Sequence, residues 1–522
     1  MTWRLDTVTL IAIAALNAAC SSSSTNHRER TARDLLSFVD GTSVFGPASE
    51  FVPSDLPDIG GSGLFAPREP GECEVAVLAG GEDSYATRLA LLAGARHSIR
   101  VQALIFTGDE SGLRIAEVLK QKKQQGLDVR VIVDAVSNPE LQTQWMYFDL
   151  KQHGIEVEGY EALGLQIANE VPVPLVTPYY DPLLPNSRYH EKLWIVDANT
   201  PNAQAVVGGL NIANEYFRVD PANVPRYWRD QDVAVRGAVI DDLTKTFDRN
   251  FEHFKDLKQR RGGLTDAAWE VTRSILNTTG VLEIPFRRRD DLVRSVAAIE
   301  ARVTPREFRP ARCRFFQSRP RLHESYIQQA YLKLLSTAKR EVLIANAYFV
   351  PTVAMRMAIV KAARRCVRVV VLTNGAETCD TPGMNLLGRS HYSELLAAND
   401  SDEVRACPNR DAGVEVWEWI GKSPAAERQS QGLLHAKFAV ADRQIALVGS
   451  YNLDPRSERW NSESALAFES PTLGEQLARI FLDRDLATSR PIHPPEAATF
   501  DRPATVYKRF AKDFAGLFED QL

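Results

Sequence analysis

Two segments of the sequence repeat one spacing of histidine, lysine and aspartate. The first copy lies in residues 189–211 and the second in residues 434–452, and each has the form H-x-K-x4-D. In chain order the six residues are His190, Lys192 and Asp197, then His435, Lys437 and Asp442. A single H-x-K is common on surface strands. Two complete motifs at matching places, with histidines 245 residues apart, indicate one shared functional site.

The spacing within each motif suits phosphate chemistry. Side chains alternate faces along a strand, so the histidine and lysine of each copy point the same way. Small and amide residues follow each motif, where the backbone can approach a ligand; these are Gly209, Asn211, Ser450 and Asn452. Two lysines and two asparagines around two imidazoles suit a tetrahedral anion. One imidazole can attack phosphorus while the other protonates the leaving oxygen, and the lysines neutralise charge, so no metal or cofactor is expected.

The elements around the motifs also repeat, displaced by about 240 residues. The expected strands are 73–79, 98–106 and 128–135, then 312–318, 341–350 and 367–374. The expected helices are 85–95 and 111–125, then 323–340 and 352–365. Continuous apolar runs between helices are typical of a largely parallel sheet covered on both faces. Such alternation is common to all α/β proteins, but together with the motifs it predicts two pseudo-equivalent α/β domains.

The two motifs resemble the duplicated HKD signature of the phospholipase D superfamily. The resemblance covers about residues 73–488 and includes the segments NIANEYF, YWRDQDVAVRGAVIDDL, NAYFVPT and NLDPRSERWNSESALAFE. It looks most like the bacterial cardiolipin synthase branch. The resemblance implies two phospholipase D-like α/β sandwich domains that share an active site at their interface. The expected organisation is a signal segment (1–20), a flexible tether (21–70), a first domain (71–260), a linker (261–310) and a second domain (311–522).

The first motif departs from the family pattern in two ways. Ten residues separate Asp197 from Gly208, where the family usually has six, so we expect a longer hairpin turn with Pro201 and Asn202 at its tip. Gly209 stands where the family usually has serine, which removes one hydroxyl from that half. Neither change removes a catalytic group.

The resemblance also implies the roles of the acidic residues. Asp197 and Asp442 belong to the motifs, but strand alternation turns them away from the histidines, and the family gives them structural or ion-pairing work. A histidine usually has a carboxylate that orients its far nitrogen. By resemblance this partner comes from the segment after the opposite motif: Glu463 in one case, and Asp230 or Asp232 in the other.

The N-terminus has the order of a secretory signal. Arg4 precedes an apolar run over 8–16, and two alanines precede Cys20. A cysteine at this place resembles a bacterial lipoprotein signal, although Asn17 stands where the family prefers leucine. This predicts a lipidated Cys20 on a protein of the bacterial cell envelope that faces the periplasm or exterior. Cleaved secretion and an uncleaved anchor are the alternatives.

Five further cysteines have no spacing typical of a zinc site. Cys366 is expected in the core, and a Cys379–Cys407 disulfide is possible outside the cytoplasm. Residues 287–321 hold eleven arginines and four acids in a chain of 522 residues with a net charge of −5. This stretch suits either phosphate headgroups or a linker whose arginines pair with acids. The overall charge gives no field that attracts nucleic acid, so none is expected as a partner.

The leading hypothesis for function is a phosphatidyltransferase that forms a phosphohistidine and makes cardiolipin from phosphatidylglycerol at a membrane surface. The first alternative is a phospholipase D-type hydrolase that releases phosphatidic acid, since only the acceptor differs. A family nuclease is a third. A scaffold with a relic site would predict damaged motifs, whereas both motifs are complete.

Overall fold

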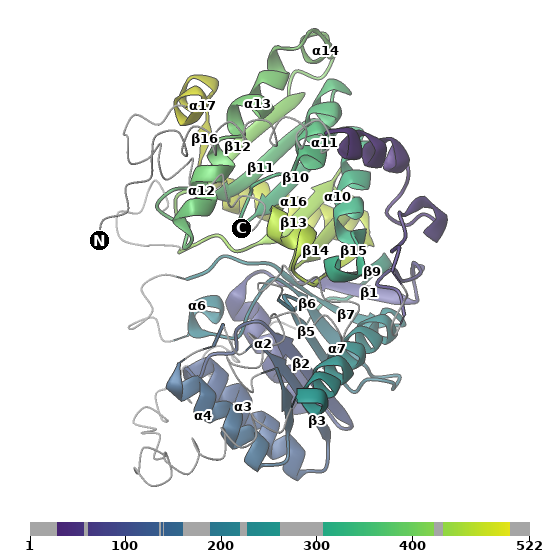
Figure 1. Ribbon diagram of the computed structural model, residues 1–522, viewed down its shortest axis with the longest axis vertical. Helices are drawn as coiled ribbons and strands as arrows, with labels where there is room; N and C mark the ends of the chain where they lie inside the picture. Colours follow the sequence, from purple (N-terminus) through teal and green to yellow (C-terminus); the bar gives the residue numbers. More distant parts are fainter. Residues whose placement is uncertain are drawn as a thin grey trace, which may run out of the picture.

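The computed structural model describes residues 29–56, 61–134, 137–138, 140–159, 188–219, 227–261, 306–421 and 432–501. Two α/β halves stack on one another, the first half below the second in Figure 1. Each half contains one eight-stranded sheet, and the two strand orders are β4-β3-β2-β5-β6-β7-β1-β8 and β16-β12-β11-β10-β13-β14-β15-β9. These orders match strand for strand through the part of each sheet that carries a motif. The two pseudo-equivalent halves expected from the sequence are therefore confirmed.

The first half contains strands β1 (Cys73–Val77), β2 (Ser98–Ala103), β3 (Asp128–Val133), β4 (Glu156–Glu158), β5 (Leu193–Val196), β6 (Gln204–Gly208) and β7 (Asp232–Gly237), with β8 (Arg309–Pro310) added at its edge. Its helices are α2 (Gly81–Gly94), α3 (Glu110–Gln124), α4 (Leu141–Gln152), α6 (Asn214–Phe217) and α7 (Val239–Arg261). The expected strands and helices of this half lie within a few residues of these bounds.

The second half contains strands β9 (Arg312–Ser318), β10 (Glu341–Asn346), β11 (Arg368–Asn374), β12 (Gly413–Trp419), β13 (Lys437–Ala441), β14 (Ile445–Gly449), β15 (Glu463–Glu469) and β16 (Ser489–Ile492). Its helices are α10 (Tyr326–Thr337), α11 (Val353–Arg364), α12 (Pro382–Arg389), α13 (Tyr392–Ala397), α14 (Asp402–Arg405), α15 (Pro455–Arg459), α16 (Pro471–Arg479) and α17 (Pro494–Asp501).

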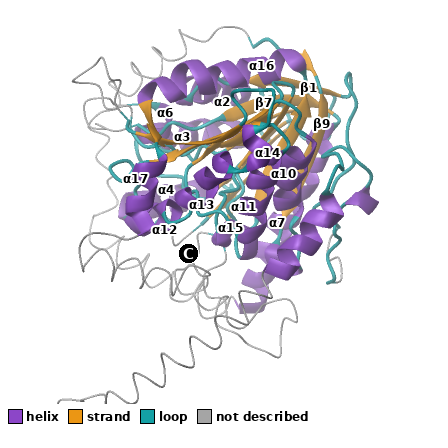
Figure 2. Ribbon diagram, turned by 90° about the horizontal axis from the view of Figure 1, so that it is seen from above, coloured by secondary structure: helices purple, strands orange, loops and turns teal. Residues whose placement is uncertain are grey.

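Both sheets are mixed, so the expectation of a largely parallel sheet is wrong. In the second half, β10, β11 and β12 pair in parallel, whereas β10–β13, β13–β14, β14–β15 and β15–β9 are antiparallel. The first half has the same pattern. Buried strands read as continuous apolar runs in either direction, because both faces are covered by helices (Figure 2). The apolar runs therefore predicted strands but not their direction.

The two halves share one apolar core. Residues of β1, β5, β6 and α7 cluster with residues of β9, β13, β14 and α16 in a single buried group. Helix α7 of the first half contacts β9, and α16 of the second half contacts β1. Each half thus places one helix against the other half, and strand β6 contacts β14 and β15 across the interface. This exchange fixes the two motif hairpins relative to one another.

The segment expected to be a tether is packed over much of its length. Residues 29–39 form a helix, and Val39, Phe45 and Phe51 are buried against the second half. Further along, Leu64 and Arg68 form bridges with strand β9. The expectation of a flexible tether is wrong for 29–56 and 61–70, because scattered apolar residues anchor this polar segment. Within the described residues, we find no helix with the length and apolar composition needed to cross a bilayer.

Two disulfides join cysteines that the sequence did not pair. Cys366 bonds to Cys407, so the Cys379–Cys407 bridge that the sequence allowed does not form, and Cys379 has a free thiol. Cys366 follows α11 and Cys407 follows α14, and these helices contact one another. Cys73 of β1 bonds to Cys313 of β9 and joins the two halves. Their sequence separation of 240 is close to the offset of the repeat, so the two cysteines occupy similar places in the two halves.

Candidate active site

Each motif lies at the start of an antiparallel hairpin. The histidine and lysine enter β5 in the first half and β13 in the second, and the hairpin returns through β6 or β14. The turn between β5 and β6 runs over 197–203, against 442–444 for the second hairpin. The longer turn expected around Pro201 and Asn202 is confirmed.

The motif histidines are held by the opposite half. The backbone N–H of His190 donates to the carbonyl of Ser462 at 2.8 Å, and that of His435 donates to the carbonyl of Arg229 at 2.7 Å. Short parallel bridges at Tyr189–Ser462 and Arg229–Leu434 mark the same two crossings. The two crossings are related by the repeat, so the motifs meet at the interface between the halves.

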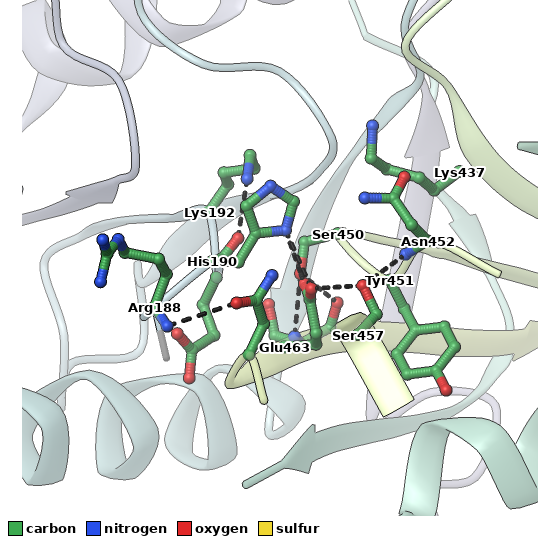
Figure 3. Close-up of polar contacts among 12 residues, drawn as sticks. Arg188, His190, Lys192, Lys437, Ser450, Tyr451, Asn452, Ser457 and Glu463 are labelled. Carbon is green, nitrogen blue, oxygen red and sulfur yellow. Dashed lines mark hydrogen bonds and ion pairs between the residues drawn. The ribbon is translucent and has the colours of Figure 1, made fainter. Parts of the chain in front are cut away.

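Each histidine has a carboxylate partner from the other half. Nδ1 of His190 lies 2.8 Å from Oε2 of Glu463, and Nδ1 of His435 lies 2.6 Å from Oδ2 of Asp230. With the Nδ1 proton donated to the carboxylate, Nε2 of each ring carries the lone pair that can attack or take up a proton. Figure 3 shows the His190–Glu463 pair among its polar neighbours.

The strand register explains why Asp230, and not Asp232, is the partner of His435. Gly208 pairs with Asp232 as Gly449 pairs with Ala465, so Asp230 and Glu463 occupy equivalent positions. Asp232 instead forms a buried ion pair with Arg88 at 2.7 Å. The choice that the sequence left open is thus decided by the pairing of β6 with β7.

The motif aspartates lie in the hairpin turns. Oδ1 of Asp197 accepts from three successive backbone N–H groups, those of Arg96, His97 and Ser98. Asp442 accepts from the backbone N–H of Lys339 through Oδ2 and from those of Arg340 and Glu341 through Oδ1. Both have positive φ, 53° and 52°, which aspartate tolerates better than most residues. These contacts match the structural work that the resemblance implies and place neither carboxylate with the histidines.

The lysines lie deeper than the histidines and are almost fully buried. Nζ of Lys192 donates to the carbonyl of His190 at 2.7 Å, and Nζ of Lys437 donates to the carbonyl of His435. Burial lowers the pKa of Lys192 to about 7 and that of Lys437 to about 8. An anion placed between them would favour their charged forms, because opposite charges stabilise one another in a dry site.

The same burial acts on the two histidine–carboxylate pairs. It raises the pKa of Glu463 to about 7 and that of Asp230 to about 6. Burial, followed by the nearby lysines, lowers the pKa of His190 and of His435 well below its usual value. Both imidazoles are therefore neutral at pH 7 without substrate, as a nucleophilic nitrogen must be.

The hydroxyl of Ser450 does not face an open phosphate position. It donates to Oε2 of Glu463 at 2.5 Å, and the hydroxyl of Ser457 donates to Oε1 at 2.8 Å. The equivalent Gly209 has no such role, since a Cβ on it would lie 2.3 Å from Oδ1 of Asp230. The hydroxyl that the first half lacks at Gly209 corresponds to one that bonds a carboxylate in the second half. Glycine makes room for the shorter aspartate side chain.

The two asparagines differ in their contacts. Asn211 donates to the hydroxyl of Tyr216 at 3.0 Å and accepts from the backbone of Ile105. Oδ1 of Asn452 is buried and has no hydrogen-bond partner among the described residues. In Figure 3 its side chain lies beside Lys437. Oδ1 of Asn452 only accepts, so a bound anion would have to meet the Nδ2 donor of this side chain.

Most of the arginine stretch at 287–321 lies outside the described residues. Of its described members, Arg306, Arg312 and Arg319 pair with Asp83, Glu69 and Glu324. These contacts match the linker interpretation, in which the arginines pair with acids.

A pair of histidine–carboxylate dyads shared between duplicated α/β halves, each with a buried lysine, defines the phospholipase D superfamily. Residues 89–254 and 331–486 match the family model described as "Cardiolipin synthase, PLD-like domain", and the chain belongs to this family.

Curated relatives and one solved structure agree with this membership. The chain is 25% identical to a cardiolipin synthase of Halalkalibacterium halodurans over 346 aligned residues. This alignment covers 66% of this chain and 52% of that protein. It is 26% identical to cardiolipin synthase B of Shigella flexneri over 65% of this chain and 63% of that protein. The chain thus spans about half to two thirds of these relatives. The crystal structure of phosphatidylserine synthase from Haemophilus influenzae has the same fold, with a TM-score of 0.55 and 15% identity over 90% of this chain and 98% of that one.

Proposed function

We propose that this chain is a phosphatidyltransferase that acts through a phosphohistidine and makes cardiolipin from phosphatidylglycerol. The observation that carries the proposal is the pair of cross-interface dyads, which offers one neutral imidazole to attack phosphorus and a second to handle the proton. The names of the curated relatives support the choice of a phospholipid substrate.

In the proposed reaction, Nε2 of His190 attacks phosphorus and the bond to the headgroup oxygen breaks. His435 gives that oxygen a proton and then takes one from the incoming alcohol, whose oxygen displaces His190. For its first task His435 must gain a proton, which the anionic substrate and Asp230 favour. Lys192, Lys437 and Asn452 hold the non-bridging oxygens, with Asn211 as a positioning residue.

The test is incubation with phosphatidylglycerol in detergent micelles, with lipid products identified by mass. Cardiolipin and free glycerol are expected, and phosphatidic acid alone would favour the hydrolase. His190→Ala should abolish the base-stable, acid-labile phosphohistidine, and His435→Ala should slow its formation. His153→Ala, at the exposed histidine that follows helix α4, is the matched control. Labelling of His435 in the His190→Ala variant would reverse the roles, and loss of activity in EDTA would contradict the metal-free scheme.

We also propose that a lipidated Cys20 anchors the protein to a membrane of the cell envelope. The two disulfides support a location outside the cytoplasm, since such bonds persist in oxidising compartments. The eight residues between Cys20 and the packed segment that begins at residue 29 can span at most about 30 Å. The folded body would therefore stay close to the bilayer that contains the substrate. Cys20→Ser should release the protein from membranes while leaving turnover of micellar lipid unchanged, and an unprocessed Met1 would contradict the proposal.

A further inference from the structure

The two sides of the active site carry different side chains despite the repeat. On the His435 side, the rings of Tyr216 and Trp228 pack edge-on against the imidazole, with centroids 5.2 Å and 5.0 Å away. The equivalent positions on the His190 side are Ser457 and Asn461, which are small and polar. The two sides are therefore not built to bind the same chemical group.

The charges differ as well. Arg188 stands two residues before His190, where the second motif has Leu433. Arg456 lies close enough to His190 to lower the pKa of that histidine, and its counterpart in the repeat is Glu215. Arg188 and Arg456 thus lie on the His190 side, whereas Arg229, which lies close to Asp230 on the other side, is paired with Asp485. The other side is aromatic and carries the carboxylate of Asp380.

Tyr348 and Asp380 form a hydrogen-bonded pair on the His435 side. Tyr348 follows β10, Asp380 precedes α12, and the phenol donates to Oδ1 of Asp380 at 2.6 Å. The ring centroid of Tyr348 lies 6.0 Å from Nζ of Lys437, which in turn bonds the carbonyl of His435. Asp380 is exposed, so the pair connects solvent with the lysine proposed to hold phosphate.

This pair presents acceptors to a ligand. The single phenol proton of Tyr348 is donated to Asp380, so the phenol oxygen can only accept from a ligand, and the second carboxylate oxygen of Asp380 can also accept. Two adjacent acceptors suit two hydroxyl donors on neighbouring carbons. The carboxylate disfavours an anionic group, and the ammonium of Lys437 disfavours a cationic one. The ligand that fits is a neutral vicinal diol.

We propose that Tyr348 and Asp380 bind the headgroup of the phospholipid through its vicinal diol. The inference rests on the proposed function, in which the leaving oxygen lies opposite His190 and therefore on the His435 side. As the bond from Nε2 of His190 to phosphorus forms, the bond from phosphorus to the ester oxygen of the headgroup breaks. That oxygen, on the carbon next to the diol, takes a proton from His435. The incoming alcohol then occupies the same subsite, gives its proton back to His435 and displaces His190.

The experiment compares two donor lipids with identical dioleoyl chains in detergent micelles. Phosphatidylglycerol presents a vicinal diol and phosphatidylethanolamine an ammonium, and headgroup release gives kcat/KM for each. The full-length protein should prefer phosphatidylglycerol. Tyr348→Phe and Asp380→Asn should each reduce this preference about tenfold, because each weakens one hydrogen bond to the diol. Glu140→Gln is the matched control, since Glu140 is the exposed acid that precedes α4 as Asp380 precedes α12.

The outcomes separate this inference from the proposed function. If phosphatidylglycerol is turned over but both variants keep the wild-type preference, the diol subsite is wrong and the proposed function stands. The same holds if the variants lose activity equally on both lipids, or if the wild type prefers phosphatidylethanolamine. If no headgroup is released from either lipid, the proposed function fails and the subsite fails with it.

Discussion

Replacing Gly209 with alanine should disable one dyad without touching either histidine. The new Cβ would lie 2.3 Å from Oδ1 and 2.8 Å from Cγ of Asp230, where an ordinary contact is about 3.4 Å or more. Asp230 is 1% exposed and its Oδ1 also accepts from the backbone of Gln231, so the carboxylate must move by about 1 Å and lose its geometry with His435. A misplacement of this size costs about 100-fold in rate, or about 2.7 kcal/mol of activation free energy.

The assay uses two substrates that differ in leaving group. In the proposed reaction, release of glycerol from phosphatidylglycerol needs a proton from His435. Release of p-nitrophenol from a p-nitrophenyl phosphodiester needs little protonation, because p-nitrophenolate is a good leaving group. Gly209→Ala should therefore lose about 100-fold on the lipid and much less on the activated substrate. Ser450→Ala, at the equivalent position, adds no atoms and should spare the His435–Asp230 pair. An equal loss on both substrates, with an unchanged melting temperature, would refute the assignment of Asp230 and His435 to proton transfer.

Three further predictions concern neighbouring groups. Asp230→Asn should lower turnover of phosphatidylglycerol with little change in melting temperature, whereas Asp232→Asn should lower stability by about 3 kcal/mol, because it breaks a buried ion pair with Arg88; denaturant titration separates the two effects. Burial lowers the pKa of Lys192 to about 7, so its ammonium is present below that pH and is lost above it. The value of kcat/KM should therefore fall as pH rises through 7–8. In the Lys192→Arg variant this fall should move to higher pH, because arginine keeps its charge. The Cys73→Ala/Cys313→Ala double variant should lose more stability than Cys366→Ala/Cys407→Ala, because its loop spans 240 residues against 41. The chain-entropy model gives losses of about 5.5 and about 4 kcal/mol, and peptide mapping without reductant should find both bridges in the parent protein.

Much of the site could be predicted from the sequence because its residues recur at fixed spacings. His190, Lys192 and their counterparts define the motifs, and Glu463 follows from the family resemblance. The choice of Asp230 over Asp232 depends on the register between β6 and β7, which no local pattern reveals. The pair of Tyr348 and Asp380 joins two loops that are 32 residues apart and carry no motif. Its members meet because β10 and β11 are neighbours in the sheet.

Other features were missed because their signals are weak in a single chain. The helix at 29–39 buries few side chains and reads as polar, so its packing against α10 depends on tertiary contacts. The expectation of a largely parallel sheet was wrong because buried strands have similar apolar sequences in parallel and antiparallel sheets. The connectivity of cysteines cannot be derived from their positions alone.

The crossing of the dyads has an evolutionary consequence. His190 relies on Glu463 and His435 relies on Asp230, so neither half contains a working histidine–carboxylate pair. An ancestor with one motif per chain would have needed two identical copies to build the site, and any substitution would have appeared on both sides at once. In a chain that carries both halves each side can change alone, and the two sides do differ, with Gly209 against Ser450 and Asp230 against Glu463. Under the proposed function, this freedom would let one side specialise in attack on phosphorus and the other in exchange of the alcohol.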